Sequence, residues 1–307
     1  MSGPRLALAL WLLSAATHST AIGAPFQIQQ VATGVFVHFG RPLDLTAPGH
    51  DDIANIGFIV GSRCVAVIDT GGSVRVGRAL LAAVGQRAQK PICYVINTHV
   101  HVDHVLGNAA FASSRASFIG HAALPEAIAR SRLYFLQHYS EDLDSPATAQ
   151  QIIAPDRRVQ DSLELDLGGR RLQLRAWPVA HTDCDLTVLD ESTGTLWTGD
   201  LLFRQRLPAV DGDVDGWLNA IDEMARFRIR RAIPGHGPLA TDLPAALEPE
   251  RRYLRALLDG VRSAIDLGES LPDAINGVAA AEKPQWLLWD NTHPRNVTRV
   301  YQQLEWK

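Results

Sequence analysis

The sequence predicts an α+β fold in which two β-sheets pack together and helices cover their outer faces. Two successive blocks of short strand-like runs each end in helical patterns, and a helix-covered pair of sheets buries the apolar faces of both. A chain of 307 residues, with 46% hydrophobic and 20% charged residues, can build the sizeable core that such a sandwich needs. The same composition excludes a disordered, collagen-like or disulfide-framework protein.

The first block begins with four short apolar runs. The Gly-Gly pair at 71–72 ends the fourth run, and Val74, Leu80, Leu81 and Val84 then recur at helical spacing. Two further strands follow, and a helix at about 122–138 completes the block. The predicted strands are Phe26–Val31, Val35–Phe39, Ile56–Val60, Cys64–Asp69, Tyr94–Ile96 and Ser117–Ile119.

The second block repeats this order of strands followed by helices. Its predicted strands are Leu163–Leu167, Leu172–Pro178, Leu186–Leu189, Leu196–Thr198 and Arg231–Ile233, with a helix at Trp217–Phe227. The C-terminal part has helical periodicity at Leu254, Leu257, Leu258, Val261 and Ile265, and again at Val297, Val300, Tyr301 and Leu304. We therefore expect a main domain at 25–245 and a C-terminal helical extension at 246–307 packed on it.

The first 24 residues have the pattern of a secretory signal peptide. Arg5 precedes the apolar run Leu6–Ala16, and small residues follow. The run is too short to span a bilayer, and the alternatives are an N-terminal membrane anchor or a buried first helix. No later segment is long and apolar enough to cross a membrane. We expect an exported, periplasmic protein without stable membrane insertion.

The net charge of the chain and the distribution of its basic residues indicate which classes of partner it can bind. The formal net charge is −4 and no run of lysine and arginine stands out, which disfavours a nucleic-acid partner. We expect a small-molecule substrate instead.

Three cysteines, Cys64, Cys93 and Cys184, form no disulfide scaffold. Cys64 and Cys93 lie in apolar runs and are interpreted as buried small hydrophobic residues, with a bridge between them left open.

The chemistry is concentrated in the segment from Asn97 to His104. His99, His101, Asp103 and His104 place four candidate metal ligands within six residues. On an extended segment His99 and His101 point the same way and can reach one ion. If the chain then turns, Asp103 and His104 point elsewhere and can hold a second ion. A histidine-rich polar turn without metal is the alternative.

Three later residues share one context. His181, Asp200 and His236 each lie just beyond a short apolar run. Side chains released at strand ends converge on one cleft, and Gly199, Gly235 and Gly237 allow sharp turns there. Each of the three would be unremarkable alone, but together with the 99–104 cluster they predict a metal site.

The order and context of these segments resemble those of the metallo-β-lactamase superfamily. The matching segments are Asp69 in Ile68-Asp69-Thr70-Gly71, the run 99–104, His181, Thr198-Gly199-Asp200 and the Pro-Gly-His-Gly around His236. The resemblance spans about residues 27–240 and implies an αββα sandwich of two mixed sheets. It implies that His99, His101 and His181 bind a first zinc, that Asp103, His104 and His236 bind a second, and that Asp200 bridges the two.

The resemblance also implies a mechanism. Two Zn²⁺ ions are expected, with iron or manganese as alternatives. Zinc lowers the pKa of bound water toward about 7, so a metal-bound hydroxide is the expected nucleophile. Asp103 and Asp200 are the expected catalytic residues, Asp103 because it can orient that nucleophile. The sequence has no Gly-x-Ser-x-Gly elbow, and none is required.

Residues outside the ligand set are expected to orient the histidines. Each ligating imidazole needs an acceptor for its other N–H, and Asp69 is the first candidate, with Thr98, Thr182, Thr198 and Asn108 as others. Asp69 can equally be a turn-stabilising residue before Gly71. Cys184 is not expected to be a ligand, because the seven-ligand set is complete without it. His293 is a candidate substrate-facing residue.

More narrowly, the chain is similar to exported hydrolases called quinoprotein relay system zinc metallohydrolases, relatives of a sulfur-oxidation operon hydrolase. The segments Asn97–Asn108, 181–188, 210–212 and 294–299 carry this similarity. It implies an exported dinuclear zinc hydrolase with a periplasmic quinoprotein system as partner, but it does not establish the substrate. We expect an activated acyl bond to be cleaved, in a thioester, lactone, ester or amide.

Two other functions stay open. One is a β-lactamase-type hydrolase of cyclic amides, although Asp200 stands where the commonest class of these enzymes has a cysteine. The other is a non-catalytic metal-binding accessory protein of the quinoprotein system. We expect specificity to lie in Arg41–Ala54, in about 122–150 and in Leu202–Gly216.

Overall fold

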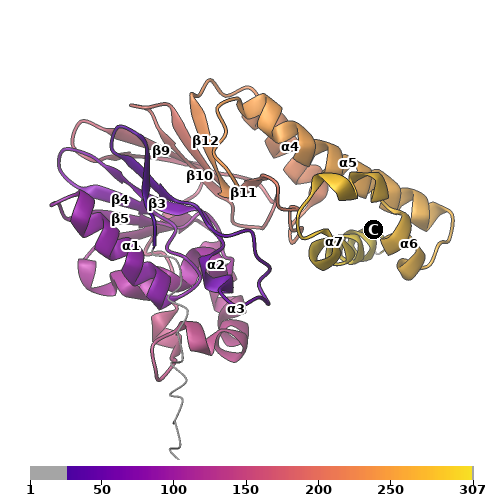
Figure 1. Ribbon diagram of the computed structural model, residues 1–307, viewed down its shortest axis with the longest axis horizontal. Coiled ribbons are helices and arrows are strands. Elements are labelled where there is room, and N and C mark those ends of the chain that lie inside the picture. The colour runs from indigo at the N-terminus through magenta and orange to yellow at the C-terminus, as the bar shows by residue number, and fades with distance from the viewer. Residues whose placement is uncertain (1–25, 306–307) are drawn as a thin grey trace, which may run out of the picture.

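The computed structural model describes residues 26–305 and contains two β-sheets packed face to face, with helices outside (Figure 1). This confirms the predicted α+β sandwich. The predicted signal peptide at 1–24 lies outside the described residues. None of the helices within residues 26–305 combines the length and the hydropathy that a membrane span requires.

The first sheet has seven strands in chain order. β1 to β4 pair antiparallel, and β4 to β7 pair parallel. The strands are β1 (Gln29–Ala32), β2 (Val35–His38), β3 (Ile56–Val60), β4 (Val65–Ile68), β5 (Ile92–Ile96), β6 (Ser117–His121) and β7 (Arg157–Val159). The short β7 was missed in the sequence because two of its three residues are arginines.

The second sheet has five strands in the order β12-β11-β10-β9-β8. Only β11 and β12 pair parallel. The strands are β8 (Ser162–Asp166), β9 (Arg171–Ala176), β10 (Leu186–Asp190), β11 (Thr195–Phe203) and β12 (Arg231–His236). β11 is longer than the predicted Leu196–Thr198, because the polar segment Thr198-Gly199-Asp200 hides its continuation. Gly199 has a φ of 52°, and the β11–β12 register shifts beside it.

Strand alternation explains how the first sheet faces two cores. Ala66 and Ile68 of β4 belong to the apolar cluster between the sheets, whereas Val65 and Val67 belong to the cluster under α1 (Val74–Arg87). α1 begins at its cap Ser73, whose side chain accepts a hydrogen bond from the Val76 N–H.

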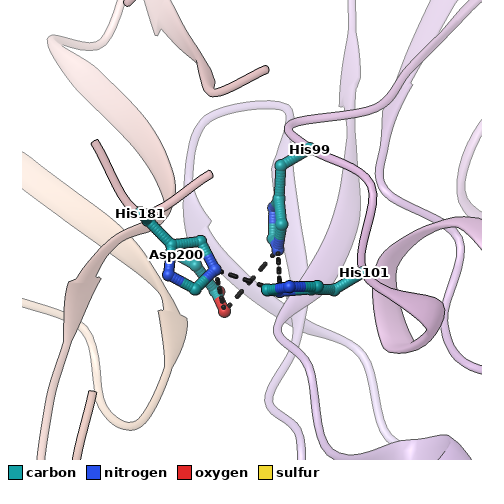
Figure 2. Close-up of side chains that lie close together, drawn as sticks. All are labelled: His99, His101, His181 and Asp200. Atoms are coloured by element: carbon teal, nitrogen blue, oxygen red, sulfur yellow. Dashed lines mark hydrogen bonds and ion pairs between the residues drawn. The ribbon is translucent and has the colours of Figure 1, made fainter. Parts of the chain in front are cut away.

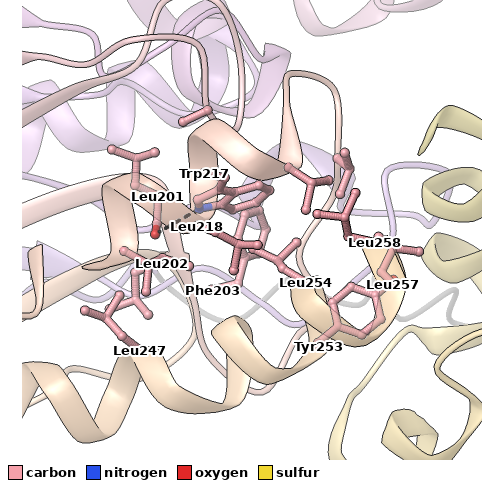
Figure 3. Packing of buried hydrophobic residues seen from close by; sticks show 14 of the residues in the cluster. Leu201, Leu202, Phe203, Trp217, Leu218, Leu247, Tyr253, Leu254, Leu257 and Leu258 are labelled. Carbon is pink, nitrogen blue, oxygen red and sulfur yellow. Dashed lines mark hydrogen bonds between the residues drawn. The ribbon is translucent and has the colours of Figure 1, made fainter. Parts of the chain in front are cut away.

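Helices from two parts of the chain cover the outer face of the second sheet. α4 (Val214–Met224) and α5 (Leu243–Asp266) share one apolar cluster with β11 (Figure 3), and α7 (Trp289–Glu305) adds Val297 and Val300 to it. Trp217 of α4 is fully buried in this cluster, and its indole N–H donates to the carbonyl of Leu201. Of the C-terminal helices, α5 contacts the strand that carries Asp200, and α7 packs on α5 (Figure 1). The domain boundary at 245 stays a prediction.

The remaining helices are short or lie on the edges of the sandwich. They are α2 (Val102–Val105), α3 (Leu124–His138), α6 (Leu271–Gly277) and the 3₁₀ turns His50–Asp52, Leu106–Ser114, Ser140–Asp142, Ala149–Gln151 and Ala280–Gln285. α2 supplies the change of direction after His101 that the ligand spacing required.

Cys64 and Cys93 form a disulfide that links the start of β4 to β5, with a Cα–Cα distance of 5.8 Å. Cys64 is fully buried and Cys93 half-buried. The pairing left open by the sequence is therefore present, and Cys184 is a free, buried thiol.

Candidate metal centre

One edge of the sandwich brings together all seven predicted ligands. His99 and His101 follow β5, Asp103 and His104 lie in α2, His181 lies between β9 and β10, Asp200 lies in β11, and His236 ends β12. They form two groups, within each of which one ligand atom per residue lies within 4.8 Å of every other. The grouping is the predicted one, with His99, His101, His181 and Asp200 in one group and Asp103, His104 and His236 in the other.

The first group is drawn in Figure 2. Nδ1 of His101 lies 3.0 Å from Nε2 of His99 and 3.0 Å from Nε2 of His181. Oδ2 of Asp200 lies 3.7 Å from Nε2 of His99 and 3.5 Å from Nε2 of His181. Tetrahedral zinc with metal–nitrogen bonds of about 2.0–2.1 Å holds its ligand atoms about 3.3 Å apart. The four atoms therefore have the spacing of one tetrahedral site.

The second group has similar spacing and shares Asp200. Nε2 of His236 lies 3.3 Å from Oδ2 of Asp103 and 3.3 Å from Oδ2 of Asp200. Nε2 of His104 lies 3.7 Å from Oδ2 of Asp103 and 3.2 Å from Oδ1 of Asp200. Asp200 therefore faces both groups, as a bridging carboxylate would.

Two buried atoms at the centre indicate that the site fits a metal. Within the described part of the chain, Nε2 of His104 and Oδ1 of Asp200 have no hydrogen-bond partner. Leaving buried polar atoms unpaired costs about 1–3 kcal/mol each. A divalent cation coordinated by both atoms would satisfy them, and imidazole with carboxylate is a donor set suited to zinc, iron or manganese.

Asp69 orients the second group and part of the first. Its Oδ2 accepts hydrogen bonds from Nδ1–H of His104 and from the hydroxyl of Thr98, both at 2.8 Å. Since the Thr98 hydroxyl donates to Asp69, it accepts the hydrogen bond from Nδ1–H of His99 at 3.0 Å. The proposed orienting roles of Asp69 and Thr98 therefore agree with the geometry, which leaves Nε2 of both histidines free to face the centre.

The other three histidines have orienting partners that the sequence did not indicate. His101 donates from Nε2 to Oδ2 of Asp211 at 2.7 Å, and His181 donates from Nδ1 to the Ala209 carbonyl at 2.9 Å. Nδ1 of His236 lies 2.9 Å from the Ile53 carbonyl oxygen and 3.1 Å from Nη1 of Arg206. Asp211 lies in the segment 210–212, whose sequence indicates only a resemblance to other proteins, and the two carbonyls leave no trace in a sequence.

The other candidates for orienting residues act elsewhere. Thr182 bonds to Asp185, and Thr198 bonds to the carbonyls of Gly199 and Ile233. Asn108 bonds to Asn97 and to the Ile153 carbonyl, so it supports the backbone near His104 rather than an imidazole ring. These three assignments are therefore wrong.

Burial and neighbouring charge favour the metal-binding forms of several ligands. Burial lowers the pKa of His99 well below its usual value and that of His181 to about 4. Burial raises the pKa of Asp103 and of Asp200, but the surrounding histidines outweigh it and hold both values below the usual range. Neutral imidazoles and ionised carboxylates are the forms that bind metals.

His104 differs from these histidines. Burial lowers its pKa, but the carboxylates of Asp200, Asp103 and Asp69 raise it well above the usual value. A cation in the second group would take the place of that proton, since both respond to the same negative charge.

A cleft of about 560 Å³ lies over the centre. Asp103, Asp200 and His236 of the candidate metal centre line this cleft. Segments from all three predicted specificity regions line it as well. α7 lines it as well, through Thr292, Arg295, Arg299 and Gln303, which the sequence did not predict. His293, the candidate substrate-facing residue, is buried instead against Tyr253 and Trp289, so that assignment is wrong.

An αββα sandwich with a His/Asp cluster able to hold metal at one edge defines a metallohydrolase-like class of protein. The family model described as the metallo-beta-lactamase superfamily matches residues 50–236. The chain belongs to that superfamily.

Solved structures share the fold at low sequence identity. A sec-alkylsulfatase from Pseudomonas sp. matches with a TM-score of 0.67 and 18% identity over 90% of this chain, which spans 50% of that protein's length. A metallo-beta-lactamase family protein from Thermus thermophilus matches with a TM-score of 0.64 and 19% identity, over 90% of this chain and 94% of the other. A metallo-beta-lactamase from Pontibacter korlensis matches with a TM-score of 0.59 and 17% identity, over 75% of this chain and 98% of the other. No curated protein matches this chain.

Proposed function

We propose that this chain is an exported dinuclear zinc hydrolase that cleaves an activated acyl bond in a thioester, lactone, ester or amide. The observation that carries the proposal is the position of the Asp200 carboxylate, 3.2–3.7 Å from nitrogen atoms of both histidine groups. When bound, zinc ions would supply an activated water and a Lewis acid for the substrate carbonyl.

The chain's own residues would then position the reactants. The Asp103 carboxylate lines the cleft and is held ionised, so it can accept a hydrogen bond from the attacking water and orient it. The buried histidines hold the centre rigid through their outer hydrogen bonds. Arg206 and Arg295 line the cleft together with Asp44, and their charges help to lower the pKa of that carboxyl.

Two observations support export to the periplasm. The N-terminal pattern is that of a signal peptide, and disulfides such as Cys64–Cys93 persist in oxidising compartments. We also propose membership of the quinoprotein relay group of zinc metallohydrolases, on the segments that carry the sequence similarity.

A panel of reporter substrates tests the proposal. The zinc-loaded protein is assayed with a thioester, a lactone, a cephalosporin and a sec-alkyl sulfate ester, the last because a sulfatase shares the fold. We expect turnover of an acyl reporter that falls at least about 100-fold in Asp103→Asn. Turnover of the cephalosporin alone would favour the β-lactamase alternative. No turnover above the Asp103→Asn level with any reporter would favour a non-catalytic accessory protein.

A further inference from the structure

The loop Pro208–Gly212, between β11 and α4, supplies the outer partners of two histidines in the first group. The Ala209 carbonyl accepts the hydrogen bond from His181, and the Asp211 carboxylate accepts the one from His101. In addition, the Gly212 N–H donates to the His181 carbonyl at 2.7 Å. The position of this loop therefore sets the direction of two of the three imidazoles in the first group.

Helix α7 holds this loop from the outside, and Asn296 makes the central contacts. Its side-chain oxygen accepts a hydrogen bond from the Val210 N–H at 3.0 Å, and its Nδ2 donates to the Pro208 carbonyl at 2.7 Å. These two bonds lie on either side of Ala209. Asn296 is only 1% exposed, so solvent does not compete for either bond.

Two further residues of α7 hold the end of the loop. Arg299 donates from Nη2 to the Asp211 carbonyl at 2.7 Å, and Gln303 donates from Nε2 to the Gly212 carbonyl at 2.6 Å. Positions 296, 299 and 303 are three and four residues apart, so they share one face of the helix. One helix face thus binds the backbone of Pro208, Val210, Asp211 and Gly212.

The helix itself is firmly placed. Nδ2 of Asn296 also donates to the hydroxyl of Tyr253 in α5 at 2.9 Å, and Tyr253 is fully buried. Val297 and Val300 of α7 lie in the apolar cluster that covers the second sheet. α7 is therefore a rigid support for the loop.

The second group has no such dependence on α7. The outer partner of His104 is Asp69, and Nδ1 of His236 lies near the Ile53 carbonyl and Nη1 of Arg206; none of these groups belongs to the loop Pro208–Gly212 or to α7. A disturbance of the α7 contacts should therefore reach the first group and leave the second.

We propose that Asn296, Arg299 and Gln303 are positioning residues for the first metal group and act on it through the loop Pro208–Gly212. The proposal rests on the proposed binding of two metal ions. All three residues lie outside the segment 50–236 that matches the superfamily, so they are a feature of the C-terminal extension of this chain.

Titration of the metal-free full-length protein with Co²⁺, followed by visible absorption, tests the proposal. His101→Ala identifies the absorption and affinity of the first group. We expect Asn296→Ala to weaken that group at least about tenfold and to change its absorption bands, while the other group stays within about twofold of the wild type. Gln302→Ala, an exposed amide on the same helix, is the matched control and should change neither.

Arg299→Ala and Gln303→Ala keep the proposal testable if Asn296→Ala does not fold, because neither side chain is buried. Each should weaken the first group alone, by about threefold or more. Unchanged affinities in these variants, or equal weakening of both groups, would overturn the positioning role while leaving the proposed function intact. A wild-type protein that binds no Co²⁺ would overturn both proposals.

Discussion

Asp69 shows how one residue can organise a site without contacting the substrate. Its carboxylate holds Thr98 and His104, and through Thr98 it also holds His99. Its φ of 52° lies in the left-handed region, where aspartate and asparagine are tolerated better than most residues. A single side chain thereby combines a tight turn after β4 with the orientation of two imidazoles.

Asp69→Asn should separate these two roles. Asparagine keeps the backbone conformation but replaces one carboxylate oxygen with an N–H donor, so at least one of the three bonds from Thr98 and His104 is lost. We expect zinc affinity to fall about 10–100-fold with little change in the urea midpoint of the metal-free protein. Competition with a chromophoric chelator measures the affinity. Zinc binding as tight as in the wild type would show that Asp69 only stabilises the turn.

Cys184, in contrast to Asp69, is a buried residue that takes no part in the candidate metal centre. Its thiol is buried beside the Thr182 hydroxyl at 3.5 Å, belongs to neither ligand group, and has its pKa raised by burial. Cys184→Ser should therefore bind the same number of zinc ions as the wild type, as measured by elemental analysis. The loss of one zinc per chain would make this sulfur a ligand.

At the scale of elements, α5 reaches the centre through a buried carboxyl group. Glu250 accepts a hydrogen bond from the Phe203 N–H at 3.0 Å, and the Phe203 ring stacks on His236 with centroids 5.1 Å apart. The other oxygen of Glu250 has no hydrogen-bond partner within residues 26–305. Burial raises the pKa of Glu250 well above its usual value of 4.5.

This raised pKa predicts a pH-dependent stability. Above about pH 4.5 the folded chain keeps the Glu250 proton while the unfolded chain loses it, so this group lowers stability as the pH rises. Glu250→Gln keeps the acceptor without the ionisable group. Urea denaturation in the presence of a metal chelator should show that the variant has a higher free energy of unfolding than the wild type at pH 8, and a smaller increase at pH 5. An equal increase in the free energy of unfolding at both pH values would contradict the raised pKa of Glu250. Glu248→Gln, at an exposed position of the same helix, is the control.

At the scale of the whole molecule, the features that depend on short sequence patterns could be predicted, whereas contacts between segments far apart in the chain could not. The strands, the sandwich and the cluster at 99–104 follow from short-range patterns and spacing. Asp200 and His236 could be identified from the sequence because each lies in an apolar strand, and His181 because it follows an apolar run that contains one. Asp211 and Asn296 were not identified as orienting residues, because their roles depend on a loop and a helix that meet only in three dimensions.

The central claim is that seven side chains from both sheets hold two metal ions with Asp200 between them. Elemental analysis of the zinc-reconstituted protein, after removal of free metal, tests it most directly. We predict close to two zinc ions per chain in the wild type and the loss of both metal and hydrolysis in Asp200→Ala. Trace metal in the wild type, or full metal content and activity in the variant, would contradict the claim.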